Sequence, residues 1–156
     1  MKPVYRGIAV AALQCVLVLS VAGKYELDRE RLPRVWVRTA PVDPNLPIRG
    51  RYVSMRIEVA GAPGLMDWGA VKLAVVDGRL TASPDPNNSG PVRVMHWRNG
   101  SWVLTDPVAF FIPEQVPDPS IRPQGEELWV EVSVPKKGPP RPLRLGVKRN
   151  GVLTPL

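Results

Sequence analysis

Residues 52–59 decide the fold: they read Tyr-Val-Ser-Met-Arg-Ile-Glu-Val, and apolar side chains occupy every second position from Val53 onward. Successive side chains of a β-strand point to opposite faces of its sheet, so this period of two is typical of a strand with one buried face. We therefore predict a strand here. Its core-facing side chains are Val53, Met55, Ile57 and Val59.

Similar short runs lie on both sides of this strand, each bounded by proline, glycine, asparagine or aspartate. Three pairs of runs are separated by a dipeptide that tolerates the positive φ of two-residue hairpin turns, which predicts three hairpins. These dipeptides are Asp77-Gly78, Asn99-Gly100 and Asn150-Gly151. Further strands at residues 34–39, 108–112 and 128–134 bring the expected total to nine or ten.

The chain of 156 residues contains 19 prolines, and proline both fixes φ and removes a backbone donor. A long helix is therefore expected only in the longest proline-free stretch, residues 4–32. The remainder is predicted to be mainly β, either a small antiparallel sandwich or a partly open barrel, connected by proline-rich loops. The expected loops are residues 62–69, 84–91, 113–125 and 135–142.

The N-terminal apolar run predicts a transmembrane helix. Residues 7–23 contain no charged side chain, and with Val4 and Tyr5 the run approaches the ~20 residues that span a bilayer. Membrane lipid is therefore the expected surrounding of residues 4–23. Tyr5 and Tyr25 flank the run, as aromatic residues at membrane interfaces do.

A cleaved signal peptide is the alternative, because Lys2 and Arg6 form a basic region before the run and the small residues Ser20 and Ala22, near its end, stand at plausible cleavage positions. The length of the run and its charged, helix-compatible continuation favour an uncleaved anchor. The only cysteine, Cys15, lies inside the run and can form no intrachain disulfide. We expect an anchor and charged neck at residues 1–32 and a β domain at residues 33–156.

The orientation of this anchor stays open on charge alone. Two basic residues precede the run and five follow it by residue 38, so the positive-inside rule places the C-terminal domain in the cytoplasm. A short basic tail before a first hydrophobic segment is, however, the usual export pattern.

Common catalytic and metal-binding sets are missing from the sequence. His96 is the only histidine and Cys15 lies in the apolar run, so neither a nucleophile–base pair nor a common zinc site can be assembled. No catalytic residue, cofactor or metal is therefore expected, and an enzyme is disfavoured. Carboxylates remain as acid–base candidates, although solvated surface charge accounts better for most of them. They are Asp43, Glu58, Asp67, Glu114 and the pair Glu126-Glu127.

Nucleic-acid binding is disfavoured. The net charge is +7, but the 21 basic residues are spread along the chain among 14 acidic ones. The best basic and aromatic surface would place residues 34–38 beside Tyr52 and Arg56. Long arginine stems and aromatic rings also cover the outer face of a β-sheet, which is the simpler interpretation.

Residues 41–55, reading Pro-Val-Asp-Pro-Asn-Leu-Pro-Ile-Arg-Gly-Arg-Tyr-Val-Ser-Met, are the part of the chain that suggests a relative. They resemble the start of the GDYXXLXY family, small membrane-anchored bacterial proteins named for Gly-Asp-Tyr-x-x-Leu-x-Tyr. Arg49, Gly50 and Tyr52 match this pattern. Residues 110–114, Phe-Phe-Ile-Pro-Glu, resemble a second element of the family. Glu114 could be an exposed acid held at the rim of a site. The simpler interpretation is a buried strand that Pro113 ends, with Glu114 on the loop that follows.

The chain also departs from the family pattern. Met55 replaces leucine and Ile57 replaces an aromatic residue, both with apolar side chains. Arg51 stands where the family has aspartate, so a function that needs an acid there does not carry over. Pro41 begins a predicted rigid turn in which Asp43 bonds to the following backbone.

The family has no established activity. The resemblance implies an inner-membrane anchor, a periplasmic domain and a partner among multispanning membrane proteins. We therefore expect an envelope accessory protein. The alternatives are an envelope ligand-binding domain or weak hydrolase acting through rim residues, and a cytoplasmic basic domain that binds anionic lipid or nucleic acid. The candidate interaction residues are Pro41, Asp43, Arg49, Gly50, Arg51, Tyr52, Met55, Arg56 and Glu114.

Overall fold

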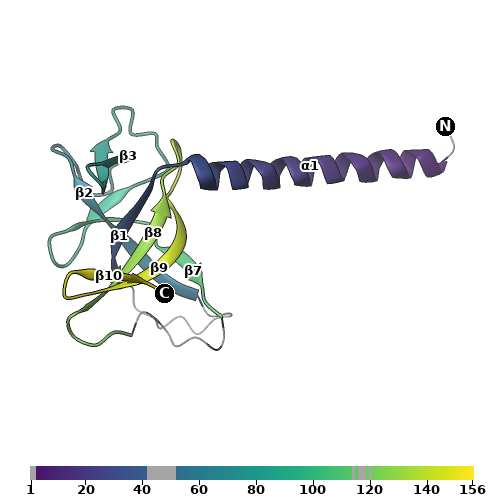
Figure 1. The fold of residues 1–156 in the computed structure, drawn as a ribbon. Coiled ribbons are helices and arrows are strands. Elements are labelled where there is room, and N and C mark those ends of the chain that lie inside the picture. The colour runs from purple at the N-terminus through teal and green to yellow at the C-terminus, as the bar shows by residue number, and fades with distance from the viewer. Residues whose placement is uncertain (1–2, 42–51, 114, 116–118, 120) are drawn as a thin grey trace. The chain divides into compact units, whose positions relative to one another are not determined.

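The computed structural model describes residues 3–41, 52–113, 115, 119 and 121–156 (Figure 1). The chain divides into two compact units, Met1–Leu32 and Pro33–Leu156.

The first unit is one helix, α1, which runs from Pro3 to Arg31. Its segment Val4–Asp28 is 25 residues long, has a mean hydropathy of 1.9 and contributes nothing to a protein core. About 20 apolar residues in a helix cross the ~30 Å of bilayer hydrocarbon. The predicted helix is confirmed, and it is long and apolar enough to span a membrane.

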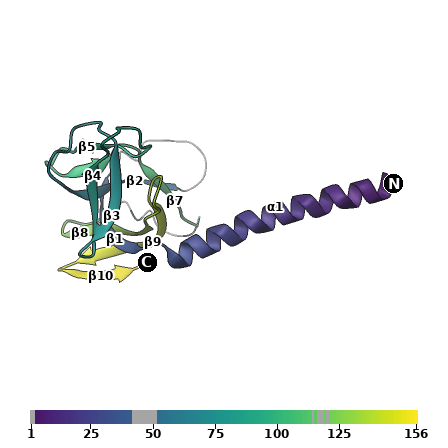
Figure 2. The same ribbon diagram turned by 90° about the horizontal axis from the view of Figure 1, so that it is seen from above.

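The second unit is a single curled sheet that forms a half-barrel (Figures 1 and 2). The mainly β prediction is confirmed, and the structure has the barrel-like form of the two that were expected. The main path through the sheet is β10-β9-β8-β1-β2-β4-β3, while β6 and β7 also pair with β2 and β5 pairs with β6. The strands of the described residues are β1 Arg34–Pro41, β2 Tyr52–Gly61, β3 Val71–Val76, β4 Arg79–Pro84, β5 Val94–His96, β6 Trp102–Leu104, β7 Val108–Phe111, β8 Glu126–Ser133, β9 Arg141–Arg149 and β10 Val152–Pro155.

Strand β2 is the centre of the half-barrel because it pairs with β1, β4, β6 and β7. Its predicted alternation is confirmed: the exposed fractions of Val53, Met55, Ile57 and Val59 are 3, 1, 0 and 7%. The other core residues come mainly from β1, β4, β5, β6 and β8. The β2–β4 pair is parallel, with Ala60 opposite Thr81, and so departs from the expected all-antiparallel arrangement.

All three predicted hairpins are present, but their turns differ. Asp77-Gly78 and Asn150-Gly151 have positive φ at both residues. A two-residue turn needs this conformation for its backbone twist to match the twist of the flanking strands. At Asn99-Gly100 only the glycine has positive φ. The amide N–H of Ser101 donates to Asn99 Oδ1 at 3.1 Å, which favours a turn of the Asx type. The expectation of a two-residue turn is wrong there, because five residues separate the paired His96 and Trp102.

Replacement of Ile57 tests the central role of β2. Ile57→Ala removes a fully buried side chain and should lower the free energy of unfolding by about 2–5 kcal/mol, whereas Ile57→Val should cost about 0.5–1.5 kcal/mol. Chemical denaturation of the full chain can be followed by tryptophan fluorescence, because all five tryptophans lie in the β domain. Arg79→Ala, at an exposed position, is the control. Equal stability of Ile57→Ala and Arg79→Ala would contradict this assignment of the core.

Candidate functional site

The structure spreads the sequence-predicted residues over several environments. Tyr52 is exposed at the start of β2 and packs edge-to-face on Phe111, with ring centroids 5.5 Å apart. Met55 is buried in the core, opposite Pro41, the last residue of β1. The remaining motif residues lie outside the described part of the chain. They are Asp43, Arg49, Gly50, Arg51 and Glu114.

Arg56 is held inside the fold. Its guanidinium donates to the backbone oxygens of Thr105 and Leu104, the latter at 3.4 Å, and lies 5.3 Å from the ring centroid of Trp97. These contacts tie the middle of β2 to the β5–β6 hairpin. The side chain therefore has a structural role that explains its position at this strand.

The outer face of β1 carries Trp36 and Arg38, as the alternation predicts. Arg38 forms an ion pair with Glu127 at 3.1 Å, and Arg144 of β9 lies 5.8 Å from the Trp36 ring centroid. Arg144 Nε also donates to Glu131 at 2.7 Å, although Glu131 is only 7% exposed. The hydrogen bond and charge of this glutamate raise the pKa of Arg144 above its ordinary value. Ion pairs and cation–π contacts thus cover this face.

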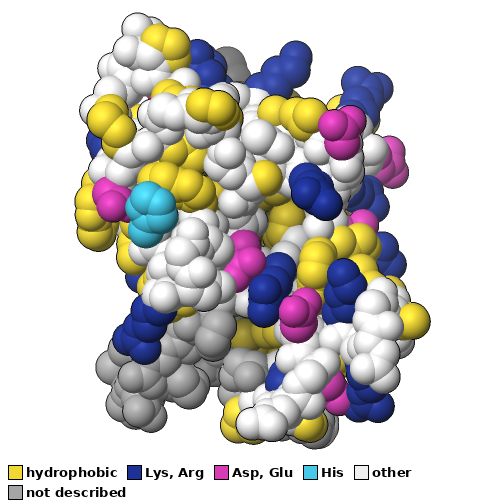
Figure 3. Space-filling view, turned by 90° about the vertical axis from the view of Figure 1, so that its left-hand side faces the viewer, with side chains coloured by type: hydrophobic (Ala, Val, Ile, Leu, Met, Phe, Trp, Pro, Cys, Tyr) yellow, Lys and Arg dark blue, Asp and Glu magenta, His cyan; other side chains and the backbone are white. Residues whose placement is uncertain are grey.

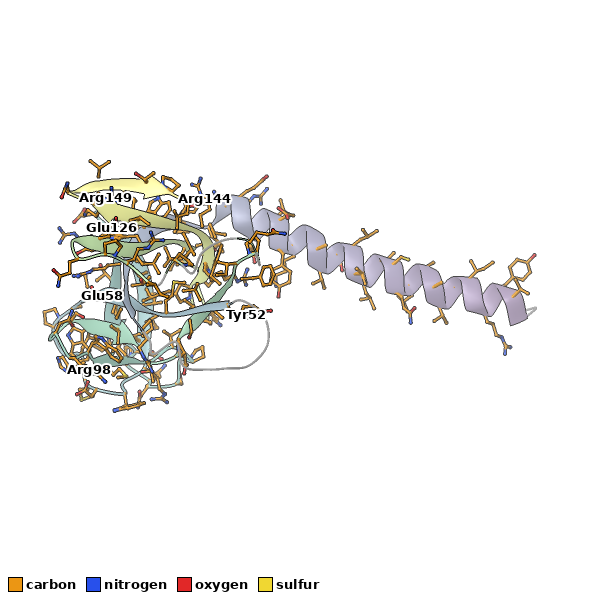
Figure 4. All side chains as sticks on the ribbon, turned by 90° about the horizontal axis from the view of Figure 1, so that it is seen from below. Tyr52, Glu58, Arg98, Glu126, Arg144 and Arg149 are labelled. Atoms are coloured by element: carbon orange, nitrogen blue, oxygen red, sulfur yellow. The ribbon has the colours of Figure 1, made fainter. Side chains whose placement is uncertain are left out.

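Two neighbouring hollows share Arg122 and Glu126 at the end of the sheet where β8 begins. The hollow against β1 and β2 has a volume of about 200 Å³. The side chain of Glu126 is 6% exposed, accepts a hydrogen bond from Arg149 and lies 3.5 Å from Arg122. Figure 4 shows Glu126 and Arg149 close together, on the adjacent strands β8 and β9. Mainly through the Arg149 hydrogen bond, these arginines lower the pKa of Glu126.

The sequence already contained a signal for the burial of Glu126. Counting back in steps of two from Val132 and Val130 places residue 126 on the inner face of β8. Glu127 is on the other face, where it also accepts a hydrogen bond from Trp129 Nε1 at 3.0 Å. The general expectation of solvated carboxylates is therefore wrong for Glu126, because the alternation continues to the first residue of the strand.

The sequence did not predict a second candidate site, although one of its residues, Asp67, was among the carboxylate candidates. We define the aromatic surface as Met66, Asp67, Trp68, His96 and Trp102. Met66 and Trp68 are 71 and 60% exposed on the loop before β3. The His96 ring packs on the Trp102 ring, with 3.7 Å between the ring centroids. Trp102 also packs against the backbone at Gly61. A Cβ at position 61 would lie 2.6 Å from Trp102 Cδ1, so this contact requires glycine there.

Asp67 fixes this loop to the β5–β6 hairpin. Its Oδ1 accepts the His96 backbone N–H at 2.7 Å and lies 3.1 Å from His96 Nδ1. These hydrogen bonds, the backbone one first, lower the pKa of Asp67. Figure 3 shows the histidine beside an acidic side chain, with hydrophobic side chains close by.

Trp68 has an unusual backbone conformation, with a φ of 63°. Positive φ is an outlier for a bulky residue and costs on the order of 1–3 kcal/mol. Two hydrogen bonds keep it in place: its N–H donates to the Val94 oxygen and Arg93 donates to its carbonyl oxygen, both at 2.7 Å. The fold therefore holds a large aromatic side chain in solvent against a local energetic cost.

Neither site assembles a recognisable reaction centre. Among the described residues, no group of three or more histidine, cysteine, aspartate or glutamate side chains could hold a metal ion. Glu126 is already paired with arginine, and His96 is already stacked on an indole ring. The aromatic surface offers apolar area, an indole N–H and a histidine, which are groups that recognise a partner by contact.

No family model, curated protein or solved structure matches this chain. The resemblance to the GDYXXLXY family therefore remains a prediction. Of the positions Arg49, Gly50 and Tyr52 that match the family pattern, only Tyr52 lies within the described residues.

The Glu126 ion pairs predict a specific acid sensitivity. A carboxylate whose pKa is lowered by folding stabilises the folded state above its ordinary pKa, and this stabilisation is lost as the pH falls through the folded-state value. The thermal midpoint of the wild type should therefore fall more between pH 6 and pH 3 than that of Glu126→Gln. Asp106→Asn, at an exposed position, should keep the wild-type slope. Identical slopes for all three proteins would show that Glu126 is not held by these arginines.

Proposed function

We propose that this chain is a single-pass, membrane-anchored accessory protein of the cell envelope whose β domain binds another membrane protein through the aromatic surface. The observation that carries the proposal is Trp68, which is exposed and strained yet hydrogen-bonded in place. Strained backbone persists where the surrounding structure over-determines it, and such positions cluster at functional sites.

Helix α1 supports the membrane anchor. Its apolar side chains pack in no protein core, so they need another apolar environment. A bilayer supplies that environment, and a 25-residue segment is long enough to cross it. A signal sequence that is removed after export has the same features near an N-terminus and is the competing account.

The chemistry of the aromatic surface supports a protein partner. Tryptophan, methionine and arginine are enriched in the cores of protein interfaces, and a few such residues contribute most of the binding energy. Because the Asp67–His96 contacts and the Trp68 backbone bonds fix the loop before binding, little conformational entropy is lost on association. A domain tied to a bilayer meets the extramembrane parts of other membrane proteins, in agreement with the multispanning partner implied by the resemblance.

Trp68→Gly separates binding from stability. Glycine adopts positive φ without strain, so the variant should unfold at the same denaturant concentration as the wild type or a higher one. Loss of an interface hot spot costs about 2 kcal/mol or more, which corresponds to a roughly 30-fold weaker complex. We expect the tagged full-length variant, crosslinked in native membranes, to lose the membrane protein that the wild type captures.

Val152→Ser is the matched control, because Val152 is 67% exposed but lies on β10, outside the aromatic surface. It should retain the partner. The proposal fails if Trp68→Gly captures the same partner in the same yield, or if both variants lose it equally.

The proposed topology has an independent test. In a Cys15→Ser background, a single cysteine at Thr154, which is exposed on β10, should react with a membrane-impermeant maleimide in cells with a permeabilised outer membrane. Reaction only after rupture of the inner membrane would place the domain in the cytoplasm. Recovery of a soluble chain that lacks the apolar run would show cleavage instead of anchoring.

A further inference from the structure

We propose that the turn between β8 and β9, residues 135–140, binds anionic phospholipid headgroups through Lys136 and Lys137. The β domain would then contact the bilayer at a second place besides α1. This inference rests on the proposed membrane anchoring, and it assigns a lipid contact to a part of the chain that is distant from the anchor in sequence.

Strand register places this turn where the chain enters the β domain. Arg34, the first residue of β1, pairs with Ser133 of β8, and Ser133 pairs with Arg141 of β9. The Val134 N–H also donates to the Pro33 oxygen at 2.9 Å. The turn therefore begins directly after Val134, which is hydrogen-bonded to Pro33, the first residue of the domain.

Chain connectivity then limits how far the turn can be from the bilayer. Residues 4–23 form 20 helical positions and cross about 30 Å, the thickness of the hydrocarbon. The next nine residues, 24–32, add at most about 14 Å, of which the headgroup layer takes about 5–8 Å. Pro33 is thus within about 10 Å of the headgroups. This distance is close to the Debye length of about 8–10 Å at physiological salt.

The charge of the turn suits an anionic surface. Residues 132–142 read Val-Ser-Val-Pro-Lys-Lys-Gly-Pro-Pro-Arg-Pro and contain three basic residues and no acidic one. Lys136 and Lys137 are both exposed. The acidic residues of β8 lie elsewhere along the strand: Glu126 and Glu127 are at its opposite end, and Glu131 is buried beside Arg144.

The turn is also rigid, which keeps the lysines presented together. Four of residues 135–142 are proline, and Gly138 supplies a φ of 95° that other residues rarely adopt. Pro139 and Pro140 line a hollow with Pro107 and with the oppositely charged Arg93 and Asp106. Little ordering is therefore needed when the lysines meet a surface.

Headgroups are a better occupant than a soluble anion because the anchor holds the bilayer permanently within reach. A tethered surface acts at a high effective concentration, so weak contacts become occupied. Each lysine near an anionic membrane contributes about a five-fold preference, and two give about 25-fold before screening. Free phosphate lacks this advantage and should not compete at physiological concentration.

Residue-resolved lysine labelling tests the proposal on the full-length chain in nanodiscs. The discs contain phosphatidylcholine alone or with about 30% phosphatidylglycerol, an anionic fraction that creates a negative surface potential. In the anionic discs, an amine-reactive reagent should modify Lys136 and Lys137 at least about five-fold more slowly. High salt should abolish the difference, whereas inorganic phosphate added to the neutral discs should not reproduce it.

Lys148 is the internal control. It pairs with Glu127 near the end of the β8–β9 ladder that lies away from the turn. Lys148 is seven residues beyond Arg141, the first residue of β9, and is therefore about 23 Å along the strand from the turn. Its labelling should be equal in both discs. Equal labelling of Lys136 and Lys137 in both discs would overturn the lipid contact while leaving the anchor intact. A chain that does not co-elute with the discs would overturn the anchor and, with it, this inference.

A second readout uses the five tryptophans as donors and a dansyl headgroup label as acceptor. Energy transfer in the wild type should rise when phosphatidylglycerol is included. The double variant Lys136→Gln, Lys137→Gln should lose this rise, and Lys148→Gln should keep it. An unchanged rise in the double variant would assign the attraction to other residues and refute the role of the turn.

Discussion

The buried face of β2 is the constraint on which the rest of the β domain depends. Its four apolar side chains point into the core, and four strands pair along its two edges, so the curvature of the sheet follows from how these partners share the edges of β2. β1 and β4 are the neighbours of β2 on the main path, while β6 and β7 pair with β2 off that path. A single sheet can thus enclose its own core without a second sheet packed against it.

The outer surface follows from the same alternation. On β1, β8 and β9 the side chains that point away from the core are aromatic or charged, and they are joined by ion pairs and cation–π contacts. Trp36 lies so close to Gly146 that a Cβ there would approach its ring to 2.8 Å. An aromatic ring over a strand glycine covers backbone that would otherwise be exposed. Arginine and tryptophan on this face are therefore explained by packing, while the exposed Met66 and Trp68 of the aromatic surface have no such explanation.

Local pattern predicted much of the fold. The period of two located β2, and the Asp-Gly and Asn-Gly pairs located the hairpins, because both signals depend on neighbouring residues only. The parallel β2–β4 pair was not predictable in this way, since the paired residues Ala60 and Thr81 are 21 positions apart in the sequence. The same limit applies to Trp68: its φ is imposed by Val94 and Arg93, which sequence proximity does not reveal. Glu126 was different, because the alternation placed it inward and only its charge argued otherwise.

A half-barrel, unlike a closed barrel, leaves two strands at the ends of its main path, β3 and β10. Unpaired edges invite addition of a foreign strand, and natural proteins limit this with short strands, proline and lysine. Here β10 is four residues long and ends in Pro155, and β3 carries the exposed Lys72. Both edges are therefore poor templates for main-chain pairing. A partner that approaches either of these two edges must accordingly be recognised by its side chains, because addition of a foreign strand there is disfavoured.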